Sequence, residues 1–177
     1  MTMPIITAPL PTKGQLQAKL LTLSQMPAGF IHAVVGAGSG TSAGSCPTSA
    51  RPGNRGVKVY EAFAKSTVGP IAIEALGVAP SVAQAKEVFR DLQVSLPTCV
   101  RAAHIAPMSL PALGEQRYAA VLKGISVPAG FSARMDVAIV RTDRTLVVMV
   151  EIGITPNNAQ QFALLTEAAV AKVESLL

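Results

Sequence analysis

The sequence predicts a single α+β domain in which helices flank a twisted, mainly antiparallel sheet. Helical and extended patterns follow each other in the order helix, strands, helix, strands, helix, and short connections join the extended segments. A chain of 177 residues is long enough for one substantial core. We find no internal repeat and no second domain, and divide the chain into an N-terminal tether, 1–11, and one α+β domain, 12–177.

The first predicted helix begins after Thr12. Gln15 follows three residues later, which matches a capping box. The apolar stripe at helical spacing is Leu16, Leu20 and Leu23. We expect Pro27 to end this helix, since proline cannot continue the hydrogen-bond pattern. The stretch GFIHAVV, residues 29–35, then predicts a short strand.

The middle of the chain predicts two strands and a second helix. The extended patterns are VKVYEAFA, from Val57, and VGPIAIEALGV, from Val68. The helix starts at Ser81, with Gln84 again three positions later. Its apolar stripe is Val82, Ala85, Val88, Phe89, Leu92 and Leu96. We expect Pro97 to end it.

The second half predicts further strands near 100–105, 116–126 and 131–141, the last paired with 146–152. A two-residue turn at Thr142–Asp143 sets the predicted register of this hairpin. The expected pairs are Met135 with Val150, Val137 with Val148, Ile139 with Leu146 and Arg134 with Glu151. Apolar pairs then share one face, so a slip by one residue would spoil the pattern.

A final helix is predicted from Thr155, with Pro156 at its first position. Its buried stripe is Phe162, Leu165, Ala169, Val173 and Leu176. This helix completes the predicted order of elements.

The glycine-rich stretch VVGAGSGTSAGSC, residues 34–46, raises the question of a dinucleotide site. The fingerprint needs three glycines as GxGxxG between a strand and a helix. Gly36 and Gly38 fit, but Thr41 takes the third position, and no helix pattern follows. We therefore interpret 36–56 as a flexible connection without a phosphate site.

The charge pattern does not indicate nucleic-acid binding. The net charge is +5, from 15 basic and 10 acidic residues, but the basic residues are scattered and aromatic residues are few. No window reaches the length of a membrane span. The first residues lack the pattern of a signal peptide. The chain is thus expected to be cytosolic, or to be a form from which an export signal was removed.

The sequence predicts neither a cofactor nor a metal site. His32 and His104 have no ligand spacing around them. The two cysteines, Cys46 and Cys99, are either buried free thiols or one bridge. Such a bridge would close a loop of about 54 residues and stabilise the fold by roughly 4 kcal/mol.

Candidate ligand-binding residues lie on the predicted strands. Arg134, Asp136 and Glu151 are expected to form a polar cluster, either a solvated face with a salt bridge or a patch facing a ligand in a cleft. Tyr60 and Tyr118 either line an apolar pocket or pack in the core. There is no G-x-S-x-G, and no acidic pair suggests general acid–base work, so we assign no catalytic residue.

Several short motifs carry a resemblance to a known family. They are LLTLSQMPAGF, GSC, PSVAQAKEVFRDLQVSLPTC, PALGEQRYAA, DVAIVRTDRTLVVMVEIG and AVAKVESLL. Together they resemble an actinobacterial family of extracytoplasmic sensor domains. That family includes the sensor domain of PknH-type serine/threonine kinases and related cell-envelope lipoproteins.

The resemblance implies an exported domain with a twisted antiparallel sheet and a cleft that binds an unknown ligand. It also implies that Cys46 pairs with Cys99. The kinase sensor has two bridges, whereas this chain has cysteines for one. The family offers no catalytic residues to carry over.

Two functional hypotheses follow. The first is a non-enzymatic extracytoplasmic domain, in the cell envelope or secreted, that binds a small or lipidic ligand or an envelope partner. A missing N-terminal anchor would allow peripheral membrane association. The second is a small cytosolic actinobacterial enzyme, of cyclase or isomerase type, with a shaped apolar pocket. A bridge and an open groove favour the first, and free thiols with an enclosed polar cavity favour the second. A structural oligomer would instead expose an apolar patch.

Overall fold

The computed structural model describes residues 8–34, 56–127, 130–154 and 157–174. These form a seven-stranded sheet in the order β1-β2-β3-β7-β6-β5-β4, and every neighbouring pair is antiparallel. The strands are β1 (Ile31–His32), β2 (Val57–Ala64), β3 (Ile71–Val78), β4 (His104–Pro107), β5 (Gln116–Ser126), β6 (Ser132–Thr142) and β7 (Thr145–Gly153). The predicted α+β domain with an antiparallel sheet is confirmed.

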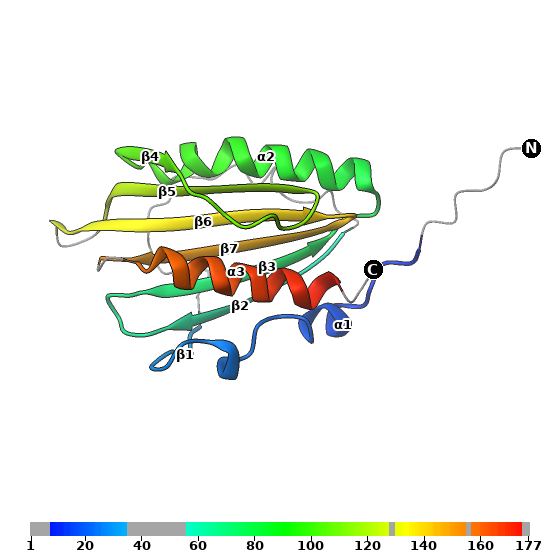
Figure 1. Ribbon diagram of the computed structural model, residues 1–177, viewed down its shortest axis with the longest axis horizontal. Coiled ribbons are helices and arrows are strands. Elements are labelled where there is room, and N and C mark those ends of the chain that lie inside the picture. The colour runs from blue at the N-terminus through cyan, green and yellow to red at the C-terminus, as the bar shows by residue number, and fades with distance from the viewer. Residues whose placement is uncertain (1–7, 35–55, 128–129, 155–156, 175–177) are drawn as a thin grey trace, which may run out of the picture.

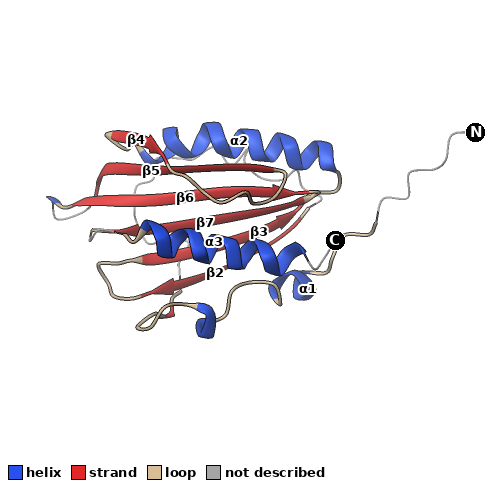
Figure 2. Ribbon diagram, viewed as in Figure 1, coloured by secondary structure: helices blue, strands red, loops and turns tan. Residues whose placement is uncertain are grey.

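Helices cover both faces of the sheet (Figures 1 and 2). They are α1 (Lys13–Gln17), the 3-10 turn η1 (Leu23–Gln25), α2 (Val82–Val100) and α3 (Ala159–Glu174). α1 and α3 pack on one face and α2 packs on the other, because alternate side chains of β6 and β7 enter two separate apolar clusters. We call these the α3 face and the α2 face.

The hairpin of β6 and β7 lies at the centre of the sheet, and residues 137–140 of β6 are buried on both faces. Val137 and Ile139 point to the α2 face, Ala138 and Val140 point to the α3 face, and all four are at most 1% exposed. A strand buried on both faces needs an almost continuous apolar run, as residues 137–140 provide. The remaining elements pack around this pair.

The first helix is shorter than predicted. The capping box of Thr12 and Gln15 is present, but α1 ends at Gln17 and only η1 precedes Pro27. The Leu21 N–H donates to Glu74 Oε2 over 2.6 Å, so it is not available to a continuing helix. Leu23, predicted to be buried, is 38% exposed as a result.

The ends of the other helices also differ from the prediction. Ser81 caps α2 as expected, but the helix continues through Pro97 and ends before Arg101, whose φ is 48°. A proline removes one helical hydrogen bond, which the packed helix tolerates here. α3 begins at Ala159 because Asn158 Oδ1 accepts from the Gln161 N–H, a typical N-cap bond.

The hairpin register is shifted by two residues from the prediction. Thr142 pairs with Thr145, so the turn residues are Asp143 and Arg144. Asp143 has a φ of 51°, a conformation that aspartate tolerates better than most residues. The observed pairs are Met135 with Ile152, Val137 with Val150, Ile139 with Val148 and Asp136 with Glu151. A shift of two keeps every side chain on its predicted face.

The two edge strands are displaced or shortened. β1 covers only Ile31–His32 of the predicted 29–35, and β4 covers His104–Pro107 instead of 100–105. α2 occupies the chain up to Val100, so β4 can start only after the turn at Arg101. Residues 35–55, which include most of the predicted glycine-rich connection, lie outside the described residues.

Phe162 is expected to anchor α3. Its side chain is fully buried in the α3-face cluster, so Phe162→Ala should lower the free energy of unfolding by about 3–5 kcal/mol. Leu164 on the same helix is 59% exposed, and Leu164→Ala should change it by less than about 0.5 kcal/mol. Urea unfolding followed by circular dichroism measures both, and equal losses would contradict this packing.

Candidate functional site

The predicted polar cluster is present on the α3 face of the central hairpin. Arg134 Nε lies 2.9 Å from Asp136 Oδ1, and Arg134 Nη2 lies 3.2 Å from Asp136 Oδ2. Glu151 stands directly opposite Asp136 in the register. The structure therefore brings Arg134, Asp136 and Glu151 together, although the partner of Glu151 across the hairpin is Asp136 and not Arg134.

This cluster is buried rather than solvated. Asp136 is fully buried and Glu151 is 1% exposed, whereas the Arg134 side chain is 26% exposed. The guanidinium of Arg134 binds both oxygens of Asp136, which compensates that buried charge. Glu151 Oε2 is buried with no hydrogen-bond partner. The open, solvated alternative for this face is therefore wrong.

The environment of Glu151 favours its protonated form. Burial is the main cause, the neighbouring carboxylate of Asp136 adds to it, and Arg134 opposes it. Together they raise the pKa of Glu151 to about 7 from an ordinary value of 4.5. A carboxyl group whose pKa lies near neutrality is able to take up or release a proton at physiological pH.

A second buried carboxyl, Glu74, was missed in the sequence. It is fully buried on β3, opposite Met149 of β7, so it is a diagonal neighbour of Glu151 on the α3 face. Burial raises the pKa of Glu74 to about 7, against the Leu21 hydrogen bond and the charge of Lys172. The sequence does carry a signal for this buried carboxyl group, because Glu74 is the one charged residue in the apolar strand IAIEALGV.

Glu74 and Lys172 hold the same peptide group of the N-terminal segment. The Leu21 N–H donates to Glu74 Oε2, and Lys172 Nζ donates to the carbonyl oxygen of Leu20. Lys172 Nζ also lies 3.0 Å from Gln25 Oε1. β3 and α3 together therefore fix the segment between α1 and η1.

The two tyrosines do not join the polar cluster. Tyr60 and Tyr118 belong to one row on the α2 face, separated by Ala75, Val148 and Ile139 on the intervening strands. Tyr118 packs against the α2 cluster, and Tyr60 is 65% exposed on β2. Three strands lie between them, so they cannot line one small pocket.

An open apolar groove runs between α2 and the strands β3 and β7. Its volume is about 200 Å³. The lining residues are Lys58, Ala75, Leu76, Gly77, Val88, Leu92, Leu146 and Val148. Lys58 is the single charged residue among them, so the groove has an apolar floor and one cationic edge. Sequence reasoning did not identify it.

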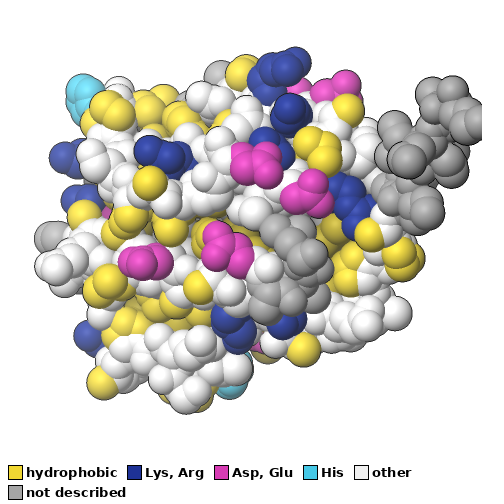
Figure 3. Space-filling model, turned by 45° about the vertical axis from the view of Figure 1, so that its right-hand side comes forward, with side chains coloured by type: hydrophobic (Ala, Val, Ile, Leu, Met, Phe, Trp, Pro, Cys, Tyr) yellow, Lys and Arg dark blue, Asp and Glu magenta, His cyan; other side chains and the backbone are white. Residues whose placement is uncertain are grey.

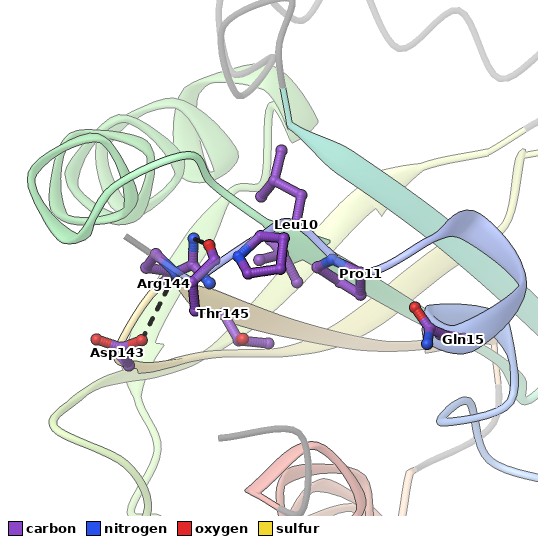
Figure 4. Close-up of a pocket in the computed structure, with 9 residues that line it drawn as sticks. Leu10, Pro11, Gln15, Asp143, Arg144 and Thr145 are labelled. Carbon is purple, nitrogen blue, oxygen red and sulfur yellow. Dashed lines mark hydrogen bonds and ion pairs between the residues drawn. The ribbon is translucent and has the colours of Figure 1, made fainter. Parts of the chain in front are cut away.

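A second hollow, of about 270 Å³, lies where the N-terminal segment meets the β6–β7 turn. Figure 4 shows Leu10 and Pro11 beside Arg144 and Thr145, with the ion pair between Asp143 and Arg144 marked. Arg144 Nη1 donates to the carbonyl oxygen of Ala8 over 2.8 Å. Ala8 to Pro11, part of the predicted tether, therefore lie against the domain.

A buried arginine, Arg141, also stabilises the β6–β7 turn. Arg141 is 2% exposed and donates to Gln116 Oε1, to Glu115 Oε2 and to the carbonyl oxygen of Asp143. These bonds satisfy the guanidinium and lower the pKa of Glu115, chiefly through the hydrogen bond from Arg141. We assign this cluster a structural role, because the guanidinium of Arg141 uses its donors to hold the turn.

Other site predictions fall partly outside the described residues. Cys46 and the side chain of Cys99 both lie outside them, and the predicted bridge stays a prediction. Within the described ranges, no group of three or more histidine, cysteine or acidic side chains is arranged to hold a metal ion. No described helix combines the length and the apolar character needed to cross a membrane. On the face seen in Figure 3, acidic and basic side chains are interspersed.

The fold and its surfaces define an α+β domain with helices on both faces of an antiparallel sheet and an open apolar groove beside α2. No model of a known protein family matches the chain, and no curated protein matches it either.

The raised pKa of Glu151 makes a prediction about stability and pH. The folded state holds the proton between pH 4.5 and about 7, where the unfolded chain has lost it. This contribution to stability is therefore complete below pH 4.5, falls as the pH rises, and is lost above about 7. Glu151→Gln should stabilise the protein by up to about 3 kcal/mol above neutrality and have little effect below pH 4.5.

Chemical denaturation across this pH range measures the effect. Glu167→Gln, on the exposed side of α3, is the matched control and should reproduce the wild-type dependence on pH. A Glu151→Gln profile that runs parallel to the wild type would show that the carboxyl ionises equally in both states.

Proposed function

We propose that the protein is a non-catalytic binding domain that holds the apolar part of a small or lipidic ligand in the groove beside α2. The observation that carries this proposal is the unequal cover of the two sheet faces. Along β3 and β7, side chains on the α3 face are buried, while those on the α2 face are half-buried apart from Leu146, which is buried next to α2. An antiparallel sheet face left only to solvent usually carries polar side chains, whereas the half-buried side chains on this face are apolar.

Further half-buried apolar side chains lie on the same face of the sheet beyond the groove. In addition to Ala75 and Val148 of the groove, they are Ile71, Ile73, Met135, Val150 and Ile152. Contiguous apolar surface that stays accessible is typical of sites for ligands or partners. The groove of about 200 Å³ is smaller than most pockets that enclose a whole ligand, so it suits one apolar chain or ring with the remainder in solvent.

The polar rim indicates the other end of the ligand. Lys58 lines the groove, and Tyr60 lies two residues further along β2 on the same face. An ammonium group and an exposed phenol beside an apolar floor suit a ligand with an anionic or hydroxylated head. An amphiphile of this kind fits the extracytoplasmic, envelope-associated role that the family resemblance implies.

The enzyme hypothesis has one observation in its favour. Glu74 and Glu151 both have pKa values near 7, as a general acid or base requires. A substrate would have to reach these carboxyl groups, yet neither of them lines the groove beside α2 or the hollow at the turn. A cyclase or isomerase type of activity is therefore our second candidate, and the binding domain is preferred.

Filling the groove tests the proposal. Gly77 lines it, and a Cβ at this position meets nothing nearer than the Val57 carbonyl oxygen at 4.0 Å, so Gly77→Leu fills the groove without a backbone clash. We expect this variant to weaken binding of anilinonaphthalene sulfonate, an apolar anion, by roughly tenfold or more in a fluorescence titration. Lys58→Gln should weaken it by roughly three- to tenfold through lost charge.

The matched control is Gly14→Leu, which adds the same side chain at a helical position with open space around it. It should bind the probe like the wild type. Equal affinities for wild type and Gly77→Leu, with both proteins folded, would contradict the groove as the binding site.

The predicted disulfide tests the exported role separately. We expect protein prepared without reductant to show no alkylation of Cys46 or Cys99 in mass spectrometry, and a joined peptide after digestion. Reduction should lower the free energy of unfolding by roughly 4 kcal/mol, since the bridge would close a loop of about 54 residues. Two thiols that alkylate freely in native material would favour the cytosolic alternative.

A further inference from the structure

The outer edge of β2 is only partly paired in the described structure. β1 pairs with β2 through two residues, Ile31 with Ala64 and His32 with Phe63. One further bond runs from the Ala33 N–H to the carbonyl oxygen of Ala62. Within the described residues no strand pairs with the outer edge of β2 between Val57 and Glu61.

The backbone groups of this edge point outward at Lys58 and Tyr60. In an antiparallel strand, alternate residues bond to alternate sides, and Ala62 bonds outward to Ala33. Lys58 and Tyr60 lie four and two residues before Ala62, so their N–H and C=O groups also face away from β3. The outward Ala62 N–H is satisfied by Glu61 Oε1 at 3.3 Å, which ends the paired stretch.

A hollow of about 290 Å³ lies directly beside this edge. It is lined by Lys13 and Gln17 of α1 and by Lys58, Val59 and Tyr60 of β2. Val59 is 5% exposed and forms an apolar floor, while the other four side chains are exposed. Two of these four carry positive charge, and none of the described residues that line the hollow is acidic.

We propose that this edge binds an extended acidic peptide segment of a partner protein, which adds to the sheet as a strand beside β2. The peptide residues opposite Lys58 and Tyr60 exchange backbone hydrogen bonds with them. The residue between these two lies opposite Val59, and its side chain enters the hollow because directly opposite residues share a face. There a carboxylate meets the ammonium of Lys13 and the amide of Gln17.

Charge favours an acidic peptide over a second copy of this chain. Pairing two copies through this edge would bring Lys13 and Lys58 of each copy to the same interface, where like charges repel. A peptide carboxylate instead finds the complementary charges of Lys13 and Lys58, and Glu61 of β2 is not among the described residues that line the hollow. The inference does not depend on the ligand groove, which lies on the α2 face of the sheet.

The test uses short peptides and the folded protein. The probe is an acetylated and amidated Thr-Val-Glu-Val-Thr peptide, with Thr-Val-Lys-Val-Thr as its charge control. We expect the glutamate peptide to bind roughly tenfold more tightly in NMR titrations. Its binding should slow amide exchange at Lys58 and Tyr60 by roughly tenfold, whereas Val59 and Glu61, already bonded to β3, should not change.

Backbone methylation separates strand addition from simple charge attraction. Methylating the nitrogens of both valines removes donors that face β2 and should weaken binding by roughly tenfold. Methylating the glutamate nitrogen, which points away from β2, should leave affinity within about twofold. In the protein, Lys13→Glu should reverse the preference in favour of the lysine peptide.

Three results would overturn the proposal. They are equal affinity for the two methylated peptides, no binding of the glutamate peptide at millimolar concentration, and slow exchange at Lys58 and Tyr60 before peptide is added. The last result would show that this chain or a second copy already covers the edge. Because Lys58 lines both hollows, Gly77→Leu, which changes only the groove, separates the two sites: it should weaken binding of anilinonaphthalene sulfonate and leave peptide binding unchanged.

Discussion

Burial of the β6–β7 hairpin on both faces is the constraint on which the rest of this structure depends. Residues 137–140 carry apolar side chains toward α2 and toward α3 alternately, so one strand pair contributes to both clusters. α2 and α3 must then occupy opposite faces, and the outer strands extend the sheet on either side. Because each helix covers only part of its face, surfaces remain open away from this centre.

The same constraint explains why polar groups of this fold are buried. Asp136 and Glu151 lie on the α3 face of the two central strands, where they are at most 1% exposed. The buried charge of Asp136 is compensated by Arg134. Glu151 and Glu74 each keep one buried carboxyl oxygen that has no hydrogen-bond partner among the described residues. These two carboxyl groups are most stable when protonated, so mildly acidic conditions favour the folded state.

Much of the fold was predictable from the sequence because alternation is a local signal. The strands β5, β6 and β7, their faces and the grouping of Arg134, Asp136 and Glu151 followed from it. The hairpin register did not, since residues 133–152 keep their apolar pattern when shifted by two. In the structure, hydrogen bonds of Arg141 and Glu115 to Asp143 hold the turn at Asp143–Arg144. The groove and the burial of Glu151 depend on where α2 and α3 pack, which periodicity within one segment does not reveal.

We propose that ligand binds on the α2 face of the sheet, beside α2. Methyl NMR during addition of anilinonaphthalene sulfonate tests it most directly, because leucine and valine methyl groups line both faces of the sheet. The account predicts shifts at Leu92, Leu146 and Val148 in the groove, with Val147 and Leu165 on the α3 face unchanged. Shifts centred on Val147 and Leu165 would contradict it and would place the site beside the buried carboxyl groups.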